Sequence, residues 1–190
     1  MLTPTYPIRT ERLSLRPYQP DDFDAALSYW SREDTTRYIP LGPFTQETFG
    51  TRLERLMQGT AIAAAGEGLV LAVVPDGEDQ VVGDMTLHWS SAEHRSGEFG
   101  FIFHPDFQGR GYATEASIPL LRMAFEDLDL HRMIARLDAR NGASAAVLHK
   151  LGLRQEAHLV ENEWIKGEWT DELVYAILQD EWRAQLSREG

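Results

Sequence analysis

The chain has 190 residues, 43% hydrophobic and 25% charged, which is an ordinary composition for a globular protein. Thirty acidic residues against 18 basic residues give a net charge of −12, and no basic face typical of nucleic-acid binders is visible, so we expect no nucleic-acid partner. The absence of cysteine excludes disulfides, thiolate zinc sites and a cysteine nucleophile.

No segment of the sequence has the features of a targeting or membrane element. The first residues lack an apolar run of signal-peptide length, and apolar runs such as Leu69–Pro75 are too short to span a bilayer. We therefore predict a cytoplasmic protein with no membrane partner. No repeat or Pro/Gly/Ser-rich linker divides the chain, which predicts a single domain over residues 1–190.

The first part of the chain predicts one strand and two helices. Leu13–Tyr18 is typical of a short strand, and Asp21–Ser31 of a helix that begins with acidic residues. Thr45 is placed to cap the second helix. The intervening segment, Arg32–Phe44, is rich in proline and glycine and predicts a loop. Helical spacing relates the apolar residues of the two helices: Phe23, Ala26, Leu27 and Trp30, then Phe49, Leu53, Leu56 and Met57.

Three strands are predicted next. Leu69–Val74 is a continuous apolar run, typical of a strand covered on both faces. A turn at Asp76–Gly77 leads to Val81–Trp89, which alternates between apolar and polar positions. Glu98–Phe103 alternates again. These runs indicate neighbouring antiparallel strands.

In the second half of the chain, the spacing of apolar residues predicts helices and strands in alternation. Helices are predicted at Tyr112–Asp127 and Ala143–Leu151, with the strand Arg132–Asp138 between them. Two final strands, Ala157–Ile165 and Glu168–Leu178, form a hairpin. The order predicts an α/β (α+β) fold in which helices flank a mixed sheet.

The strongest local signal is the loop between the strand Glu98–Phe103 and the following helix. Gly109 and Gly111 let the backbone turn sharply, and the first N–H groups of the helix have no partners within it. Such a loop is typical of a pyrophosphate site. It lacks the lysine of a Walker loop, and Thr114 stands where a dinucleotide fingerprint needs its third glycine. A turn without any ligand is the remaining interpretation.

Several motifs resemble one family. Gln108-x-x-Gly111-x-Ala113 resembles the acetyl-CoA pyrophosphate signature of the GNAT acetyltransferase superfamily. Residues 98–116 resemble its RimJ/RimL-type branch, which includes ribosomal-protein alanine N-acetyltransferases. Further matches are Arg9–Leu13, Leu15–Pro17, Asn141-x-x-Ser144 and Lys150–Leu153. The resemblance implies a mixed, mostly antiparallel sheet of about seven strands with about four helices, and two parallel strands that splay at the cofactor site.

The resemblance also implies acetyl-CoA as cosubstrate and a set of residues that bind it. The backbone near Phe101–Phe103 would face the acetyl and pantetheine portion, although plain core packing also explains these phenylalanines. The amides from Phe107 to Ala113 would hold the diphosphate. The full set is Phe101, Ile102, Phe103, Gln108, Gly109, Arg110, Gly111, Tyr112, Ala113, Thr114, Asn141, Ser144 and Lys150.

Acetyl transfer to an amine needs a proton acceptor, and two carboxylates compete for this role. Without cysteine no thiol-acylated enzyme forms, so we expect direct attack of the amine on bound acetyl-CoA. Glu163 lies in a segment that resembles the family's base-bearing hairpin, where Trp164 and Trp169 replace two tyrosines. Glu98 lies on the strand that leads to the loop, where other branches carry a base. A third alternative is that the amine binds already neutral.

Ser144 is the candidate acid for the departing thiolate. It would otherwise support the first turn of a helix that Asn141 caps, and the two roles are compatible. The six histidines show no metal-ligand spacing, so we predict no metal.

These features together predict an acetyl-CoA-dependent N-acetyltransferase. The acceptor would be a protein N-terminus or a small cationic amine such as a polyamine or aminoglycoside. Two rival interpretations are a non-catalytic acyl-CoA-binding or sensing module and a nucleotide-binding α/β domain. From the resemblance we also expect a homodimer.

Overall fold

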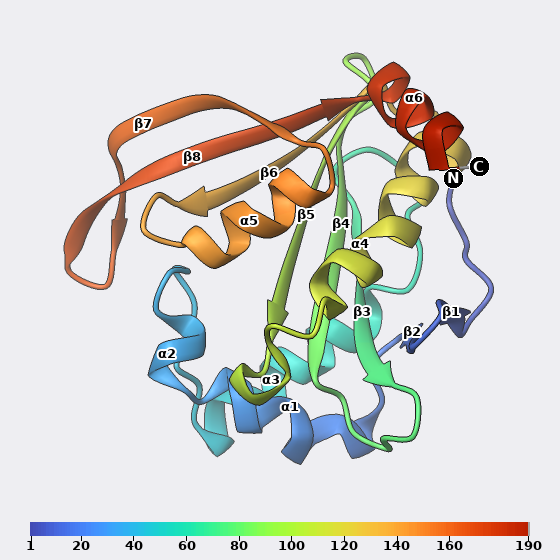
Figure 1. The fold of residues 1–190 in the computed structure, drawn as a ribbon. Helices are drawn as coiled ribbons and strands as arrows, with labels where there is room; N and C mark the ends of the chain where they lie inside the picture. The colour runs from blue at the N-terminus through green and yellow to red at the C-terminus, as the bar shows by residue number, and fades with distance from the viewer. Residues whose placement is uncertain (190) are drawn as a thin grey trace.

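The computed structural model describes residues 1–189, and its centre is an eight-stranded sheet in the order β1-β2-β3-β4-β5-β6-β8-β7. Every neighbouring pair is antiparallel except β5 and β6. Figure 1 shows the long β7–β8 hairpin reaching away from the rest of the sheet. The strands are β1 Ile8–Arg9, β2 Leu13–Arg16, β3 Gly68–Pro75, β4 Gly83–Ser91, β5 Ser96–Phe103, β6 Arg132–Asp138, β7 Arg154–Ile165 and β8 Glu168–Leu178.

Six α-helices cover the two faces of the sheet within residues 1–189 (Figure 1). Side chains of α4, α5 and α6 pack into the larger apolar core, and side chains of α1 and α3 form a second core on the opposite face. The helices are α1 Phe23–Trp30, α2 Glu33–Thr36, α3 Gln46–Gln58, α4 Tyr112–Arg122, α5 Gly142–Lys150 and α6 Gln179–Glu189. A π-helical turn, Met123–Asp127, extends α4.

The predicted mixed α/β architecture is confirmed, and the differences lie in short elements. The sheet has eight strands where about seven were expected, because β1 has only two residues and carries no periodic signal. The segment predicted as a loop, Arg32–Phe44, contains the single turn α2. The unpredicted helix α6 is held by Trp182, whose ring stacks on Phe125 at 6.1 Å. Strand β7 begins at Arg154, before the predicted Ala157, since a register shift there interrupts the alternation.

The parallel strands β5 and β6 separate soon after they meet. Their register covers only three pairs, of which Glu98 with Ile134 is the last. Beyond this point β5 continues along β4 as far as Phe103, while β6 continues along β8 as far as Asp138. The backbone of residues 99–103 therefore faces a gap in the sheet, which confirms the predicted splay.

The close packing at the start of β5 yields a stability prediction. A Cβ atom at Gly97 would lie 2.8 Å from atoms of three neighbours, the carbonyl oxygen of His88, Cδ1 of Leu130 and Sδ of Met133. We expect Gly97→Ala to lower the free energy of unfolding by about 1–3 kcal/mol, because the core cannot absorb a methyl group there without moving backbone. Urea unfolding followed by circular dichroism measures the change.

Gly100→Ala is the matched control on the same strand. A Cβ atom at Gly100 meets nothing within 4 Å, so this variant should keep or slightly raise the stability of the parent. Equal losses in the two variants would contradict the packing argument, since they would reflect only the exchange of glycine in a strand.

Candidate active site

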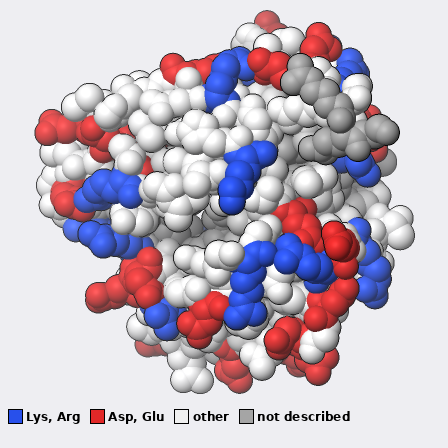
Figure 2. Space-filling model, viewed as in Figure 1, with Lys and Arg blue, Asp and Glu red and all other residues white. Residues whose placement is uncertain are grey.

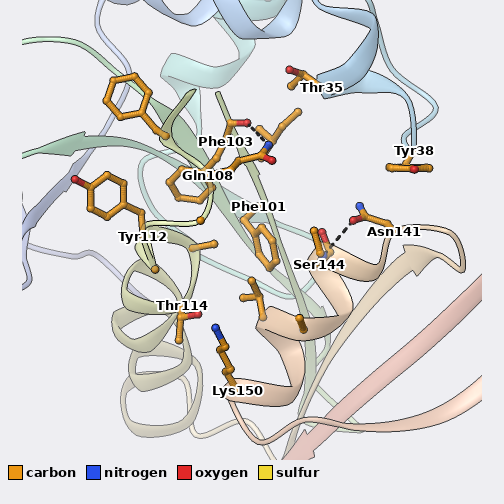
Figure 3. A pocket seen from close by; sticks show the side chains of 18 of the residues that line it. Thr35, Tyr38, Phe101, Phe103, Gln108, Tyr112, Thr114, Asn141, Ser144 and Lys150 are labelled. Carbon is orange, nitrogen blue, oxygen red and sulfur yellow. Dashed lines mark hydrogen bonds between the residues drawn. The ribbon is translucent and has the colours of Figure 1, made fainter. Parts of the chain in front are cut away.

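A cavity of about 350 Å³ opens where β5 and β6 separate. It lies between the end of β5, the loop before α4, and α5 (Figure 3). All but one of the residues predicted to bind the cofactor line it: Phe101, Ile102, Phe103, Gln108, Gly109, Gly111, Tyr112, Ala113, Thr114, Asn141, Ser144 and Lys150. We call this space the loop cavity.

Arg110 is the exception among those residues. Its Nη2 donates to the carbonyl oxygen of Asp106 at 2.9 Å, and its guanidinium lies 4.8 Å from the ring centroid of Phe107. The side chain is therefore engaged with the loop itself and does not line the cavity.

The loop presents a run of unpaired backbone amides. Those of Phe107 and Gln108 donate to His104 and Pro105 in a 3₁₀ turn, so in the stretch predicted between Phe107 and Ala113 the free amides begin at Gly109. The N–H groups of residues 109–114 donate to no acceptor within residues 1–189. Gly111 precedes the helix with φ of 82°, a left-handed conformation that turns these amides together. With the dipole of α4 they form a place for an anion.

Two side chains hold the loop in this shape. Gln108 Nε2 donates to the carbonyl oxygen of Phe103 at 3.0 Å, which ties the loop to the end of β5 (Figure 3). Glu115, in the first turn of α4, accepts hydrogen bonds from the Thr10 hydroxyl and from the backbone and side chain of Arg12. Burial opposes its ionisation, yet these hydrogen bonds lower the pKa of Glu115 below its usual value. The loop is thus fixed before any ligand arrives.

A second cavity, of about 400 Å³, continues from the first. The two share residues at their junction, among them Tyr38, Phe101, Asn141 and Ser144. The second cavity lies over the face of β4 and β5 that α1 and α3 cover, and we call it the sheet cavity. Its ionisable lining consists of Arg52, Asp84, Glu98 and Arg136.

Glu98, one of the two candidate bases, lines the sheet cavity. Its side chain is 39% exposed, and burial raises the pKa of its carboxyl group despite the opposing charge of Arg136, whose Nε lies 3.6 Å away. Arg136 also contacts the buried Glu172, with 3.5 Å between Nη1 and Oε2. Glu98 is the last residue of β5 that pairs with β6, so it stands at the opening of the gap.

Glu163, the other candidate base, is exposed and lines neither cavity. Trp164 and Trp169 pack edge to face at 5.3 Å, and both rings are more than half exposed, so they do not enclose this carboxylate. After burial and the charge of Glu172, the charge of Glu163 adds to raising the pKa of Glu98. The role of Glu163 as a base stays a prediction.

Asn141 and Ser144 lie at the junction of the two cavities. The Asn141 side chain accepts a hydrogen bond from the Ser144 backbone N–H at 3.0 Å and caps α5, as predicted (Figure 3). The hydroxyl group of Ser144 donates no hydrogen bond to another group within residues 1–189. It therefore remains available to a ligand, and its role as an acid stays a prediction.

Asp84 is a residue of the sheet cavity that the sequence analysis missed. It is 3% exposed, and its Oδ2 accepts hydrogen bonds from the hydroxyl groups of Tyr18 and Tyr29 and from Trp30 Nε1. Burial raises the pKa of this carboxyl group, against the hydrogen bonds that favour its charged form. The sequence did contain a signal for Asp84, because it is the only acidic residue within the predicted strand Val81–Trp89.

The tip of the β7–β8 hairpin reaches α2. Lys166 Nζ donates to the carbonyl oxygen of Thr36 at 2.6 Å and lies 3.2 Å from its hydroxyl oxygen. Partial burial lowers the pKa of this lysine. Thr35 and Tyr38, on either side of Thr36, line the loop cavity, so the hairpin supports the cavity wall.

Charged groups of both signs surround these cavities. Figure 2 shows Lys and Arg side chains interspersed with acidic ones around a hollow near the centre of the face, despite the net charge of −12. Among residues 1–189, His, Asp and Glu side chains form no cluster suited to a metal ion. In the same part of the chain, no helix combines the length and apolar character required to cross a bilayer.

Comparisons with known proteins agree on one family. A model of the acetyltransferase (GNAT) domain matches residues 12–154. The uncharacterized N-acetyltransferase YnaD of Bacillus subtilis (strain 168) is 33% identical over 92% of this chain and 98% of its own length. The spermidine N(1)-acetyltransferase of Escherichia coli (strain K12) is 25% identical over 95% of this chain and 89% of its own length.

A solved structure has the same fold. The crystal structure of an acetyltransferase (GNAT family) from Bacillus anthracis superposes with a TM-score of 0.80 at 33% identity. The match covers 95% of this chain and 99% of that chain.

Proposed function

Because the chain belongs to the GNAT acetyltransferase family and is an acyltransferase, we propose that it transfers the acetyl group of acetyl-CoA directly to a primary amine in a ternary complex. The observation that carries the proposal is the run of unpaired amides at residues 109–114, beside a gap in the sheet that leads to a cavity lined by carboxylates. Members of the family use acetyl-CoA as acetyl donor.

In this proposal the loop cavity holds the coenzyme. The diphosphate accepts hydrogen bonds from the amides of residues 109–114, with Lys150 near enough on α5 to add positive charge. The pantetheine arm lies in the gap and pairs with the backbone of residues 99–103, which has β4 on one side and no neighbour strand on the side of the gap. Backbone N–H groups near Phe101–Phe103 then stabilise the oxyanion that forms on the thioester carbonyl.

Glu98 is the base that the geometry supports best. The amine nitrogen attacks the thioester carbonyl carbon, the carbon–sulfur bond breaks, and the amine proton passes to Glu98 directly or through water. A carboxyl group with a raised pKa suits this task near neutral pH. Ser144, at the junction of the cavities, would supply a proton to the coenzyme A thiolate.

The acceptor class is an amine of small size or a protein N-terminus. Similarity to a spermidine acetyltransferase at 25% identity supports an amine, and the acidic side chains Asp84 and Glu98 favour a cationic one. Membership of the RimJ/RimL-type branch, a cytoplasmic location, a single domain and a homodimer stay predictions.

The rival function, a non-catalytic acyl-CoA-binding or sensing module, makes a different prediction. Both functions require coenzyme A to raise the melting temperature of the protein, since a ligand that binds only the native state stabilises it. Only the enzyme releases free thiol from acetyl-CoA when an amine is added. Binding of coenzyme A without thiol release over a broad panel of amines and peptides would support the sensing module.

The loop geometry predicts the effect of Gly111→Ala. An L-residue held at φ of 82° is strained, so the loop should move and its amides should lose their common direction. We expect the KM for acetyl-CoA to rise about tenfold, with little change in the KM for the acceptor. Gly77→Ala is the control, because Gly77 has φ of 83° in a turn remote from the cavity. A coenzyme affinity equally reduced in both variants would contradict the proposal.

The choice of base is tested by comparing Glu98→Gln with Glu163→Gln. If Glu98 takes the proton, its variant loses about 100-fold or more in kcat. The rise of kcat/KM with pH that follows ionisation of this carboxyl group should disappear as well. Arg136 keeps its contact with Glu172, so Glu98→Gln should fold normally.

Glu163→Gln should retain most of the activity and the parent pH profile. The reverse pattern, with loss in Glu163→Gln alone, would assign the proton transfer to the hairpin. Parent-like rates in both variants would favour an amine that binds already neutral.

A further inference from the structure

Arg52 is a cation of the sheet cavity that lacks a hydrogen-bonded partner within residues 1–189. It lies on α3, between Phe49 and Leu53 of the apolar face, and lines the cavity. Its guanidinium forms no hydrogen bond or ion pair with any group in residues 1–189, and its Nε atom is fully buried without an acceptor. A buried donor without an acceptor lowers the stability of the fold, so such a group is expected where a ligand supplies the acceptor.

The position of the guanidinium is fixed by its surroundings. Its Cζ lies 5.0 Å from the ring centroid of Trp30, and the indole N–H of Trp30 donates in turn to the buried Asp84. Stacking on an aromatic ring leaves the edge of the guanidinium, with its N–H groups, free to meet a planar anion. Asp84 lies near enough for the charge of Arg52 to oppose the rise in its pKa that burial causes. No ion pair within 4.0 Å joins the two, however, and Asp84 Oδ2 already accepts three hydrogen bonds.

The sheet cavity therefore has two ends that differ in their charged groups: Arg52 and Asp84 lie at one end, and Glu98 lies at the other. Glu98 with Arg136 and Glu172 forms a cluster with one excess negative charge. On β4, Asp84 pairs with Ile102, and His88, four residues further along, pairs with Glu98. The backbone positions of Asp84 and Glu98 are therefore about 13 Å apart along the strands. On β5, Phe101 and Ile102 line both cavities, so the junction with the loop cavity, where the acetyl group would be presented, lies toward the Asp84 end of the strand.

We propose that the amine acceptor also carries a carboxylate, and that Arg52 binds this carboxylate while the amine lies at the junction, with Glu98 as its base in the same cavity. The inference rests on the proposed function and narrows its substrate class to a zwitterionic small molecule. A carboxylate matches the planar donors of a guanidinium in two parallel hydrogen bonds. A polyamine has no group for Arg52 and would bring a further positive charge toward it.

The test compares acceptors that differ only at the anion. Amino acids, from glycine through longer ω-amino acids and bulkier α-amino acids, are assayed by thiol release beside their carboxamides and the corresponding alkylamines. We expect at least one carboxylate to exceed its carboxamide about 10- to 100-fold in kcat/KM, the effect of a hydrogen-bonded charge pair. Arg52→Gln should remove this preference, mainly through the acceptor KM, and Arg52→Lys should keep part of it.

Two measurements separate this inference from the proposed function. The KM for acetyl-CoA and the melting-temperature rise with coenzyme A should be unchanged in Arg52→Gln, because Arg52 lies outside the loop cavity. Arg55→Gln, an exposed arginine of the same helix, is the matched control and should behave as the parent.

Three outcomes would overturn the inference and leave the acetyltransferase intact. Carboxamides or polyamines could be acetylated as well as the carboxylates, or Arg52→Gln could lower turnover of all acceptors alike. The third is that no carboxylate-bearing amine binds the coenzyme-saturated protein in calorimetry or is acetylated by it, although other amines are.

Discussion

The site depends on one constraint of the sheet: β5 pairs with β4 along its length but with β6 only at its start. It keeps β4 and leaves β6 after Glu98, so backbone groups that a complete sheet would satisfy are left open in the interior. Unpaired backbone inside a protein is costly unless a ligand or water completes it. The gap also separates β5 from α5, which makes room for the loop cavity at the point where Gln108 fastens the loop to the end of the strand.

The same strand serves both cavities because its side chains alternate. Phe99, Phe101 and Phe103 pack with the larger core, while Ile102 packs with the second core on the opposite face. Glu98 lines the sheet cavity, and Phe101 and Ile102 line both cavities. In the proposed function, a donor along the strand edge would thus meet an acceptor that lies over the strand face. The two substrates need no covalent relay between them, in keeping with a chain that contains no cysteine.

The sequence predicted local chemistry better than contacts between distant segments. The loop around Gly111 and the cap at Asn141 were predictable because glycine conformation and capping depend on neighbours in the chain. The exposed position of Glu163 was not, since it depends on how far a hairpin extends from the sheet. Arg52 was detectable in the sequence as a charged residue within the apolar stripe of α3, where it occupies the i+3 position after Phe49 and is followed by Leu53 and Leu56. Only the packing of α3 against the sheet, which places Arg52 in the sheet cavity, shows what this interruption of the stripe means.

The contact between Lys166 and Thr36 has a consequence for how such an enzyme can diversify. It joins segments 130 residues apart in the chain, and it holds a cavity wall from outside, through a one-turn helix whose own propensity is too weak to fix it. Substitutions in a surface turn can therefore reshape the wall at Thr35 and Tyr38, the second of which also lines the sheet cavity, without altering any residue that lines either cavity. Substrate selectivity in this architecture can change gradually through mutations in the β7–β8 turn, which do not disturb the packing of the core.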